Sequence, residues 1–273
     1  MRWRACFVAC FTAAALGFAA GNALAQSEDE DQDSHILAAF AHPATLQSAP
    51  LPPAPARLVE DPARFLLFAT TDLWREGGFA YGGVLWAPTG LDRDGPVLKL
   101  MFGGGLYQYN SGALGNVTVI GRELSAAILP GWRFVRDNVT VTLFLGYDRQ
   151  AHLLTPDDPS AGLRGGYNGV TTAFELWYQP MSWAMVAADA SVSSIGPSYN
   201  VRLATGIRAF DAFYVGPEVQ AFGADGNYRQ LRAGLHVTGL RTGSVEWSAG
   251  AGFARDSDDH SGAYGKLGVL TRR

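Results

Sequence analysis

The chain has 273 residues, of which 48% are hydrophobic and 12% aromatic, and its formal net charge is −4 at pH 7. This hydrophobic content excludes a largely disordered protein, and the weakly acidic balance gives no concentrated basic face for nucleic acid. Residues 1–25 are typical of a cleaved secretory signal peptide, because Arg2 and Arg4 precede a short apolar stretch that ends in the small-residue motif Ala23-Leu24-Ala25. We therefore expect an exported protein.

A leader follows the signal peptide. Residues 26–62 begin with the acidic run QSEDEDQDS and continue as a Pro- and Ala-rich segment, a composition that buries too little apolar surface to fold. We predict a disordered tether here. Both cysteines, Cys6 and Cys10, leave with the signal peptide, so we expect no disulfide, no cysteine-bound metal and no cofactor in the mature chain.

From residue 63 to residue 273 apolar residues recur with a period of two, interrupted by short clusters of Gly, Asn, Asp, Pro and Ser. This pattern predicts one all-β domain. We expect twelve strands, with ten or fourteen left open: 63–72, 78–87, 96–109, 117–136, 138–148, 164–179, 182–194, 198–209, 212–223, 226–240, 243–256 and 261–271.

Each expected strand has one apolar face and one face with ionisable groups. In TTAFELWYQP, for example, Phe174 and Leu176 alternate with Glu175 and Trp177. A soluble barrel buries the apolar face, whereas an outer-membrane barrel turns it to lipid and packs polar groups inside. Long strands, an export signal, aromatic residues near strand ends and alternating short and longer connections favour an antiparallel up-and-down outer-membrane β-barrel.

Charged residues on the second face are then expected inside the barrel, where they can pair with one another. The predicted internal charge network comprises Lys99, Glu175, Asp189, Arg202, Arg208, Glu218, Arg232, Glu246 and Lys266. Three aromatic residues with inward parity, Tyr107, Tyr109 and Trp177, are candidate glycan contacts, since sugar rings stack on such side chains. Packing inside the barrel is the alternative for these aromatic residues.

The sequence resembles the cellulose biosynthesis protein BcsS family over roughly residues 65–272. The resemblance is carried by GFAYGGVLWAP, LTPDDPSAGLRGGYNGVTTAFELWYQP, SYNVRLATGIRAF, YVGPEVQAFGADGNYRQLRAGLHVTGLR and SGAYGKLGVLTR. It implies a role at the outer membrane in making, exporting or anchoring cellulose. The expected partners are outer-membrane lipid, cellulose or its oligosaccharides, and other subunits of a cellulose synthase complex.

Two other classes of function stay open at this point. A general or oligosaccharide porin depends on an open interior, which the sequence does not reveal. A lipid-modifying outer-membrane enzyme needs a nucleophile beside a base, and the nearest approach is His236 with Thr238, two residues apart on one strand face. We interpret the carboxylates at 155–160 and 255–262 as solvated loop tips, predict no metal site, and expect a protein without enzymatic activity.

Overall fold

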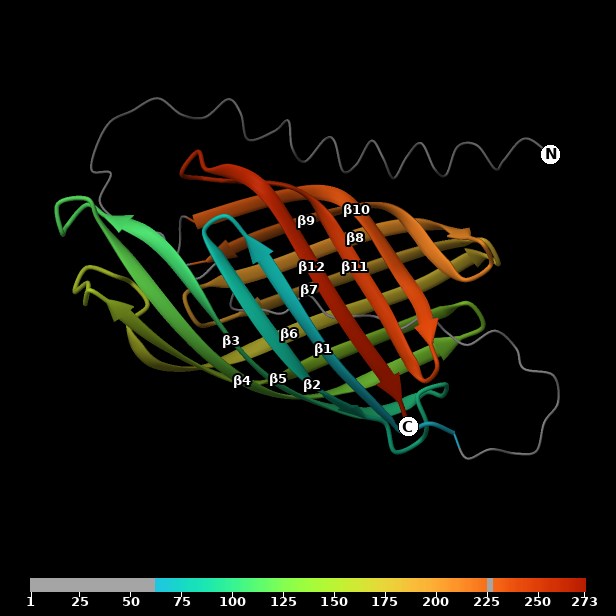
Figure 1. The fold of residues 1–273 in the computed structure, drawn as a ribbon. Coiled ribbons are helices and arrows are strands. Elements are labelled where there is room, and N and C mark those ends of the chain that lie inside the picture. Colours follow the sequence, from blue (N-terminus) through green and yellow to red (C-terminus); the bar gives the residue numbers. More distant parts are fainter. Residues whose placement is uncertain (1–61, 225–227) are drawn as a thin grey trace, which may run out of the picture. The chain divides into compact units, whose positions relative to one another are not determined.

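The computed structural model describes residues 62–224 and 228–273. The predicted signal peptide and all but the last residue of the predicted leader lie outside the described residues. The described chain forms twelve strands (Figure 1), whose bounds are β1 Phe65–Trp74, β2 Gly77–Trp86, β3 Gly95–Ser111, β4 Val117–Arg136, β5 Val139–Thr155, β6 Gly165–Met181, β7 Ala184–Ser193, β8 Ser198–Ala209, β9 Phe213–Ala224, β10 Tyr228–Thr242, β11 Val245–Asp256 and β12 Ser261–Arg272.

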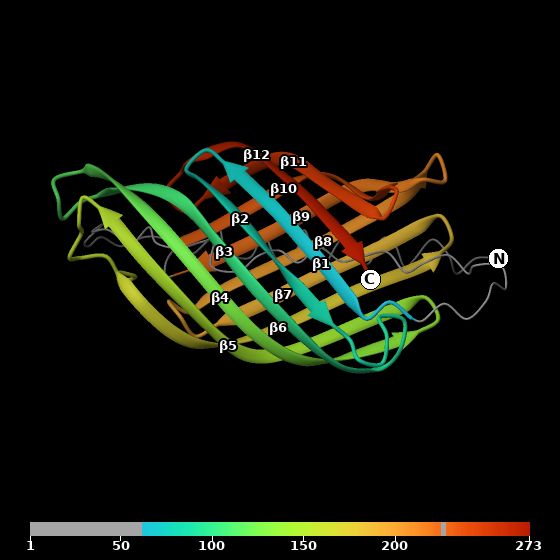
Figure 2. The same cartoon turned by 60° about the horizontal axis from the view of Figure 1, so that its bottom comes forward.

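The strands form one closed antiparallel barrel in which every strand pairs with its neighbours in sequence and β1 pairs with β12. Register between the first and last strands runs from Leu66 opposite Arg272 to Trp74 opposite Tyr264. When paired residues are followed from strand to strand once around the barrel, the path returns to β1 roughly 14 residues from where it began. For twelve strands, this stagger corresponds to a strand tilt of about 40° from the barrel axis. This tilt is visible in Figure 2. The predicted all-β up-and-down barrel with twelve strands is confirmed.

Side chains alternate between the two faces as the sequence pattern predicts. In β1 the exposed and buried positions alternate without interruption. The outward face carries large apolar side chains, including Leu124 at 65% exposure and Phe253 at 71%. The inward face carries the buried polar and charged residues, among them Glu175 and Asp189. The barrel therefore turns its apolar side outward and its polar side inward, which is the arrangement of a barrel surrounded by lipid.

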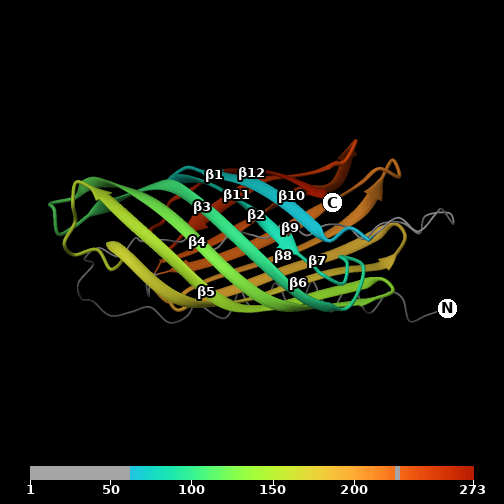
Figure 3. The same ribbon diagram turned by 90° about the horizontal axis from the view of Figure 1, so that it is seen from below.

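The two ends of the barrel differ. At the end where β1 begins and β12 ends, here called the terminal end, the turns after β4, β6, β8 and β10 are tight. The connection between β2 and β3, residues 87–94, is the exception at this end. At the opposite, distal end, β3 to β6 are the longest strands, with 17 to 20 residues. Their distal ends project beyond the other strands in Figures 1 and 3.

One expected boundary was wrong by several residues. The sequence pattern ended a strand at residue 148 and placed a long loop at 149–163, whereas β5 continues to Thr155 and the connection is 156–164. The alternation does not stop at residue 148, because Gln150 and His152 are buried inward while Arg149 and Leu153 face outward. The polar side chains in this stretch resemble a loop in composition, although they continue the strand period.

Candidate functional site

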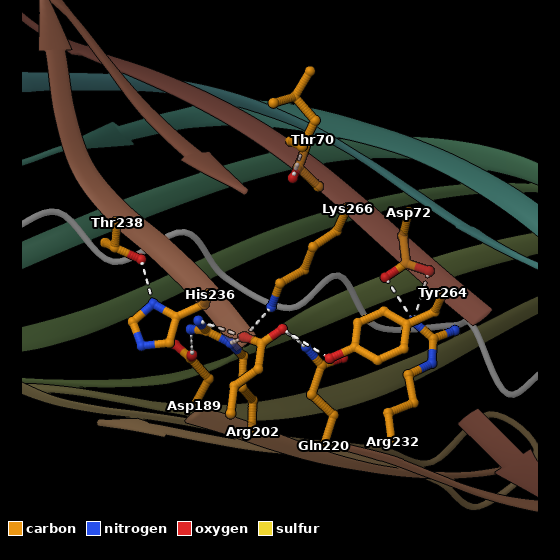
Figure 4. Close-up of polar contacts among 12 residues, drawn as sticks. Thr70, Asp72, Asp189, Arg202, Gln220, Arg232, His236, Thr238, Tyr264 and Lys266 are labelled. Carbon is orange, nitrogen blue, oxygen red and sulfur yellow. Dashed lines mark hydrogen bonds and ion pairs between the residues drawn. The ribbon is translucent and has the colours of Figure 1, made fainter. Parts of the chain in front are cut away.

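The centre of the barrel interior holds a cluster of charges around Arg202 of β8. Its guanidinium lies 3.2 Å from Asp189 of β7 and 3.0 Å from Glu218 of β9. Glu218 also accepts a hydrogen bond of 2.6 Å from Lys266 Nζ and one of 3.0 Å from Tyr264 Oη (Figure 4). Asp189 and Glu218 thus each face a cation, which offsets much of the cost of removing these charges from water.

A second ion pair joins β3 to β6 across the interior, since Lys99 Nζ donates to Glu175 Oε1. The Lys99 ammonium also lies 5.3 Å from the ring centroid of Phe68 and 5.0 Å from that of Phe144, within the range of cation–π attraction. This ion pair explains why a largely apolar strand carries Glu175. The acid is inside, and a lysine from a strand that is not its neighbour neutralises it.

Arg232 of β10 makes the third pairing, and its partner was not expected from the sequence. Its Nη1 lies 2.7 and 2.8 Å from the two carboxylate oxygens of Asp72 in β1, and its Nε donates to Gln230 at 2.6 Å. The guanidinium lies 4.8 Å from the ring centroid of Phe222 and 5.1 Å from that of Tyr264. Figure 4 shows Arg232 and Asp72 facing each other.

Glu246 lies nearer the terminal end, 3.4 Å from Arg241 and 3.5 Å from Arg272. Arg208 differs from the other members of the predicted network. It is on the inward face of β8, as expected, but it is only partly buried near the end of the strand and no ion pair joins it to the described acids. It lies six positions after Arg202 along the strand, so the acids that surround Arg202 are out of its reach.

The three candidate glycan contacts are buried, with Tyr107 and Tyr109 at 4% exposure and Trp177 at 2%. Tyr109 Oη donates to Asp158 at 3.0 Å, Tyr107 Oη lies 3.3 Å from His152 Nδ1, and the Trp177 ring packs edge-on against Tyr214. These rings offer no open face on which a sugar can stack. We therefore do not propose them as glycan contacts.

Apolar clusters close the interior toward both ends. Toward the terminal end, Leu91 and Ala87 of the 87–94 connection pack with side chains from six strands, among them Phe68 and Phe144. The connection is held by Arg133 Nε, which donates to the Leu91 carbonyl at 2.9 Å. Toward the distal end, Leu163 and Ile195 from two connections pack with strand residues including Phe79, Tyr107 and Tyr109. Two apolar layers therefore enclose the charged layer.

A small cavity remains between these layers, with a volume of about 40 Å³. Polar side chains around it include Asp148, Gln150, Thr171 and Ser191. The Thr171 and Ser191 hydroxyls and the Gln150 amide nitrogen have no hydrogen-bond partner among the described residues. This volume suits a few water molecules and is far below that of a typical ligand pocket. It contains no path for a sugar.

Asp158 lies in the connection between β5 and β6 and joins this loop to the apolar cluster toward the distal end. Its carboxylate accepts hydrogen bonds from Tyr109 Oη at 3.0 Å and from Ser160 Oγ at 2.6 Å. Burial alone raises the pKa of Asp158, but the hydrogen bonds from Ser160 and Tyr109 outweigh it and hold the pKa below its ordinary value. The loop is thus anchored by an ionised acid.

The histidine and hydroxyl that the sequence pattern placed together, His236 and Thr238, are buried inside the barrel. His236 Nδ1 lies 3.0 Å from Thr238 Oγ1, and His236 Nε2 lies 3.1 Å from the Thr205 carbonyl oxygen. His236 is 1% exposed and Thr238 is 6% exposed, so a substrate outside the barrel does not reach either group. This pair has the spacing of a hydrogen bond without the access that nucleophilic catalysis requires.

Several inward residues of the site were missed by sequence analysis. They are Asp72, Glu123, Arg133, Asp148, His152, Arg241 and Arg272. Asp72 lies on the same face of β1 as Leu66, Phe68 and Trp74. Because both faces of this strand are largely apolar, its sequence gives little indication of which face points inward. The sequence feature that could have identified Asp72 is its charge within an otherwise apolar strand, because a charged residue in a lipid-surrounded barrel is expected to face the interior.

Together these features define the class of protein: a closed β-barrel with an apolar exterior and a filled, charge-paired interior. A model of the family described as cellulose biosynthesis protein BcsS matches residues 66–273. The chain belongs to this family. No curated protein matches it.

Three solved structures are similar to this chain at low sequence identity. The translocator domain of the autotransporter NalP from Neisseria meningitidis is 14% identical, with 78% of this chain and 90% of that chain covered and a TM-score of 0.44. The transport unit of the autotransporter AIDA-I from Escherichia coli is 8% identical, with coverage of 79% and 91% and a TM-score of 0.40. A Pseudomonas aeruginosa FadL homologue is 8% identical, with coverage of 77% and 89% and a TM-score of 0.35. Among residues 62–224 and 228–273, no helix has the length and hydropathy needed to cross a membrane.

Proposed function

We propose that this protein is a non-enzymatic outer-membrane β-barrel that supports cellulose biosynthesis by anchoring, at the cell surface, the polymer or the subunits that make it. Membership of the cellulose biosynthesis family supports the process. The apolar exterior supports the location, because about thirty large apolar side chains on a soluble barrel would face water at a high cost in free energy.

The filled interior is the observation that favours an anchoring role over a role as a conduit. A cellulose chain needs a continuous channel, and a general or oligosaccharide porin needs a hydrated one. Among the described residues, apolar clusters lie toward both ends with an ion-paired layer between them, and the cavity between these layers has a volume of about 40 Å³. The outer wall and the connections between strands are then the surfaces available for partners, which we expect to be lipid, cellulose or synthase subunits.

Deletion of the gene tests this proposal when cellulose is measured separately inside the cell, on the cell surface and in the medium. An anchor predicts nearly unchanged total cellulose with a larger share shed into the medium. Accumulation inside the cell would instead support a conduit, and unchanged amount and location would refute the cellulose role. Complementation with wild-type protein and with the conservative variant Leu176→Val provides the matched control.

The location has a test of its own. Folded outer-membrane barrels migrate faster than their boiled forms in gels and fractionate with the outer membrane. We expect both behaviours for residues 63–273. Recovery of the folded protein from the soluble periplasm would contradict the proposed location.

A further inference from the structure

The outward face of the barrel carries charges of only one kind. Within the strands of residues 62–224 and 228–273, every Asp, Glu and Lys faces inward, and the only outward-facing charged residues are arginines. Four of these arginines lie on the distal half: Arg122, Arg149, Arg229 and Arg255. The fifth, Arg136, ends β4 at the terminal end, where its guanidinium contacts Asp94. The distal outer wall is therefore cationic and free of acids in its strands.

The exposed tryptophans lie at the other end of the barrel from these four arginines. Trp86, Trp132, Trp183 and Trp247 are exposed, and all four lie at the terminal end. Tryptophan rings favour a membrane–water interface, so this girdle marks one boundary of the apolar belt. Arg122 lies ten positions before Trp132 on the same face of β4. At about 3.3 Å per residue and a tilt of about 40–45°, that places Arg122 roughly 23–25 Å above the girdle, at the opposite boundary of an apolar band about 25 Å tall.

Arg122 and Arg149 form the centre of the cationic surface, on the neighbouring strands β4 and β5. Arg122 pairs in register with Leu106 and Leu153, and Arg149 pairs with Ala126 and Asn168. Both arginines are exposed, and no described carboxylate forms an ion pair with either. An arginine on a lipid-facing wall requires an anion, because a charge beside apolar neighbours is otherwise poorly solvated.

A third donor lies beside Arg149. Tyr147 Oη donates a hydrogen bond of 2.6 Å to Asn168 Oδ1, which leaves the Asn168 amide nitrogen as a donor on the exposed surface. The Cα atoms of Arg122 and Arg149 are about 14 Å apart from the strand geometry, four residues along and one strand across. Two long side chains at that spacing can contact both ends of one disaccharide headgroup.

We propose that the distal outer wall of β4 to β6 binds the phosphorylated glycolipid of the outer leaflet, with Arg122 and Arg149 on its two phosphates and Asn168 on the sugar. The inference rests on the proposed outer-membrane location, with the tight turns of the terminal end in the periplasm and the longer distal connections outside, and adds a specific lipid partner to it. Guanidinium groups bind phosphate with paired, charge-assisted hydrogen bonds, and the acyl chains of a glycolipid pack on Leu106, Leu124 and the apolar wall beneath. On the opposite side of the barrel, Arg229 also faces outward at the distal end, as does Arg255, which pairs with Asp259 at 2.7 Å.

Native mass spectrometry of the folded protein in detergent tests the proposal. The protein is titrated with bisphosphorylated lipid A, with the same lipid after removal of both phosphates, and with phosphatidylglycerol. We expect wild type to bind the bisphosphorylated lipid about ten-fold or more tightly than the other two, and Arg122→Gln/Arg149→Gln to lose this preference. Arg136→Gln, on the same strand and face but at the terminal end, should retain it.

Equal binding of all three lipids by wild type, or a preference that survives in Arg122→Gln/Arg149→Gln, would overturn the lipid site. Equal binding of phosphatidylglycerol and lipid A would also overturn it, as a general attraction for anionic lipid. Heat-modifiable migration confirms that each variant is folded. A protein that folds but does not enter bilayers would contradict the proposed location itself, so the two failures are distinguishable.

Discussion

Arg232 and Asp72 are separated by 160 positions in the sequence, yet two hydrogen bonds of 2.7 and 2.8 Å join them across the barrel interior. They come from β10 and β1, which are not neighbouring strands. The pair therefore adds a direct link between strands that lie three positions apart around the wall, which the ladder of backbone hydrogen bonds between neighbouring strands does not supply.

A double-mutant cycle should reveal this link. Replacing Asp72 by Leu or Arg232 by Met leaves one buried charge without its partner, which costs about 3–5 kcal/mol in the free energy of unfolding. Replacing both should cost less than either single change. Refolding from urea, followed by the gel mobility of the folded form, measures the effect. If the two single changes added without recovery in the double variant, the pair would not be coupled.

Two arginines on the same face of β8 offer a matched comparison. Arg202→Leu leaves Asp189 and Glu218 without their shared cation, so we expect a loss of about 3–5 kcal/mol in the free energy of unfolding. Arg208→Leu removes a partly exposed group outside the charge cluster and should change it by only about 0.5 kcal/mol. Equal losses in the two variants, measured by urea titration in bilayers, would refute the central role of Arg202.

Ion conductance provides a test of the closed interior. We expect no steady current through the purified protein in planar bilayers, because apolar side chains close both halves of the interior. Phe68→Ala with Phe144→Ala opens space only toward the terminal end, so this variant should also remain closed. Stable porin-like current steps in wild type would show that the interior opens in the bilayer.

The anchor of the 156–164 connection should depend on pH. Because the pKa of Asp158 is lowered in the folded state, its stabilising effect is fully present above the ordinary carboxyl pKa of 3.8 and is lost as the pH falls through the lowered value. At pH 7, Asp158→Asn should speed tryptic cleavage at Arg164. The difference in thermal stability between wild type and this variant should stay constant from pH 8 to pH 5 and shrink below about pH 4. A difference that already disappears near pH 6 would contradict the assignment.

The architecture could be predicted because one physical rule governs nearly every strand. Alternation with a period of two assigned Glu175 and Asp189 to the inside and Phe174 and Leu176 to the outside, and the burial of these side chains agrees. The strand count followed from the turns. No such rule assigns partners across the interior, because a contact such as Lys99 with Glu175 depends on the stagger of the whole barrel, which a local pattern does not contain.

The period-two pattern likewise did not predict that the interior is filled. The residues of the 87–94 connection appeared only as a loop too long for its end of the barrel, and the structure shows why: Leu91 packs inward with the terminal cluster. The candidate aromatic residues were placed on the correct face, but parity does not distinguish a ring that lines an open channel from one that fills a closed one. That distinction depends on barrel diameter and on side chains from several strands together.

Strict alternation between lipid and interior also constrains how the length of this chain can change. Inserting or deleting one residue within a strand such as β8 would exchange the two faces from that point to the next turn, so that Arg202 met lipid and Val201 met the charge cluster. A β-bulge, like the register shift between Thr238 and Leu240, absorbs such a residue only locally. Length differences among related chains should therefore accumulate in the connections, above all at the distal end, while the strands keep their length.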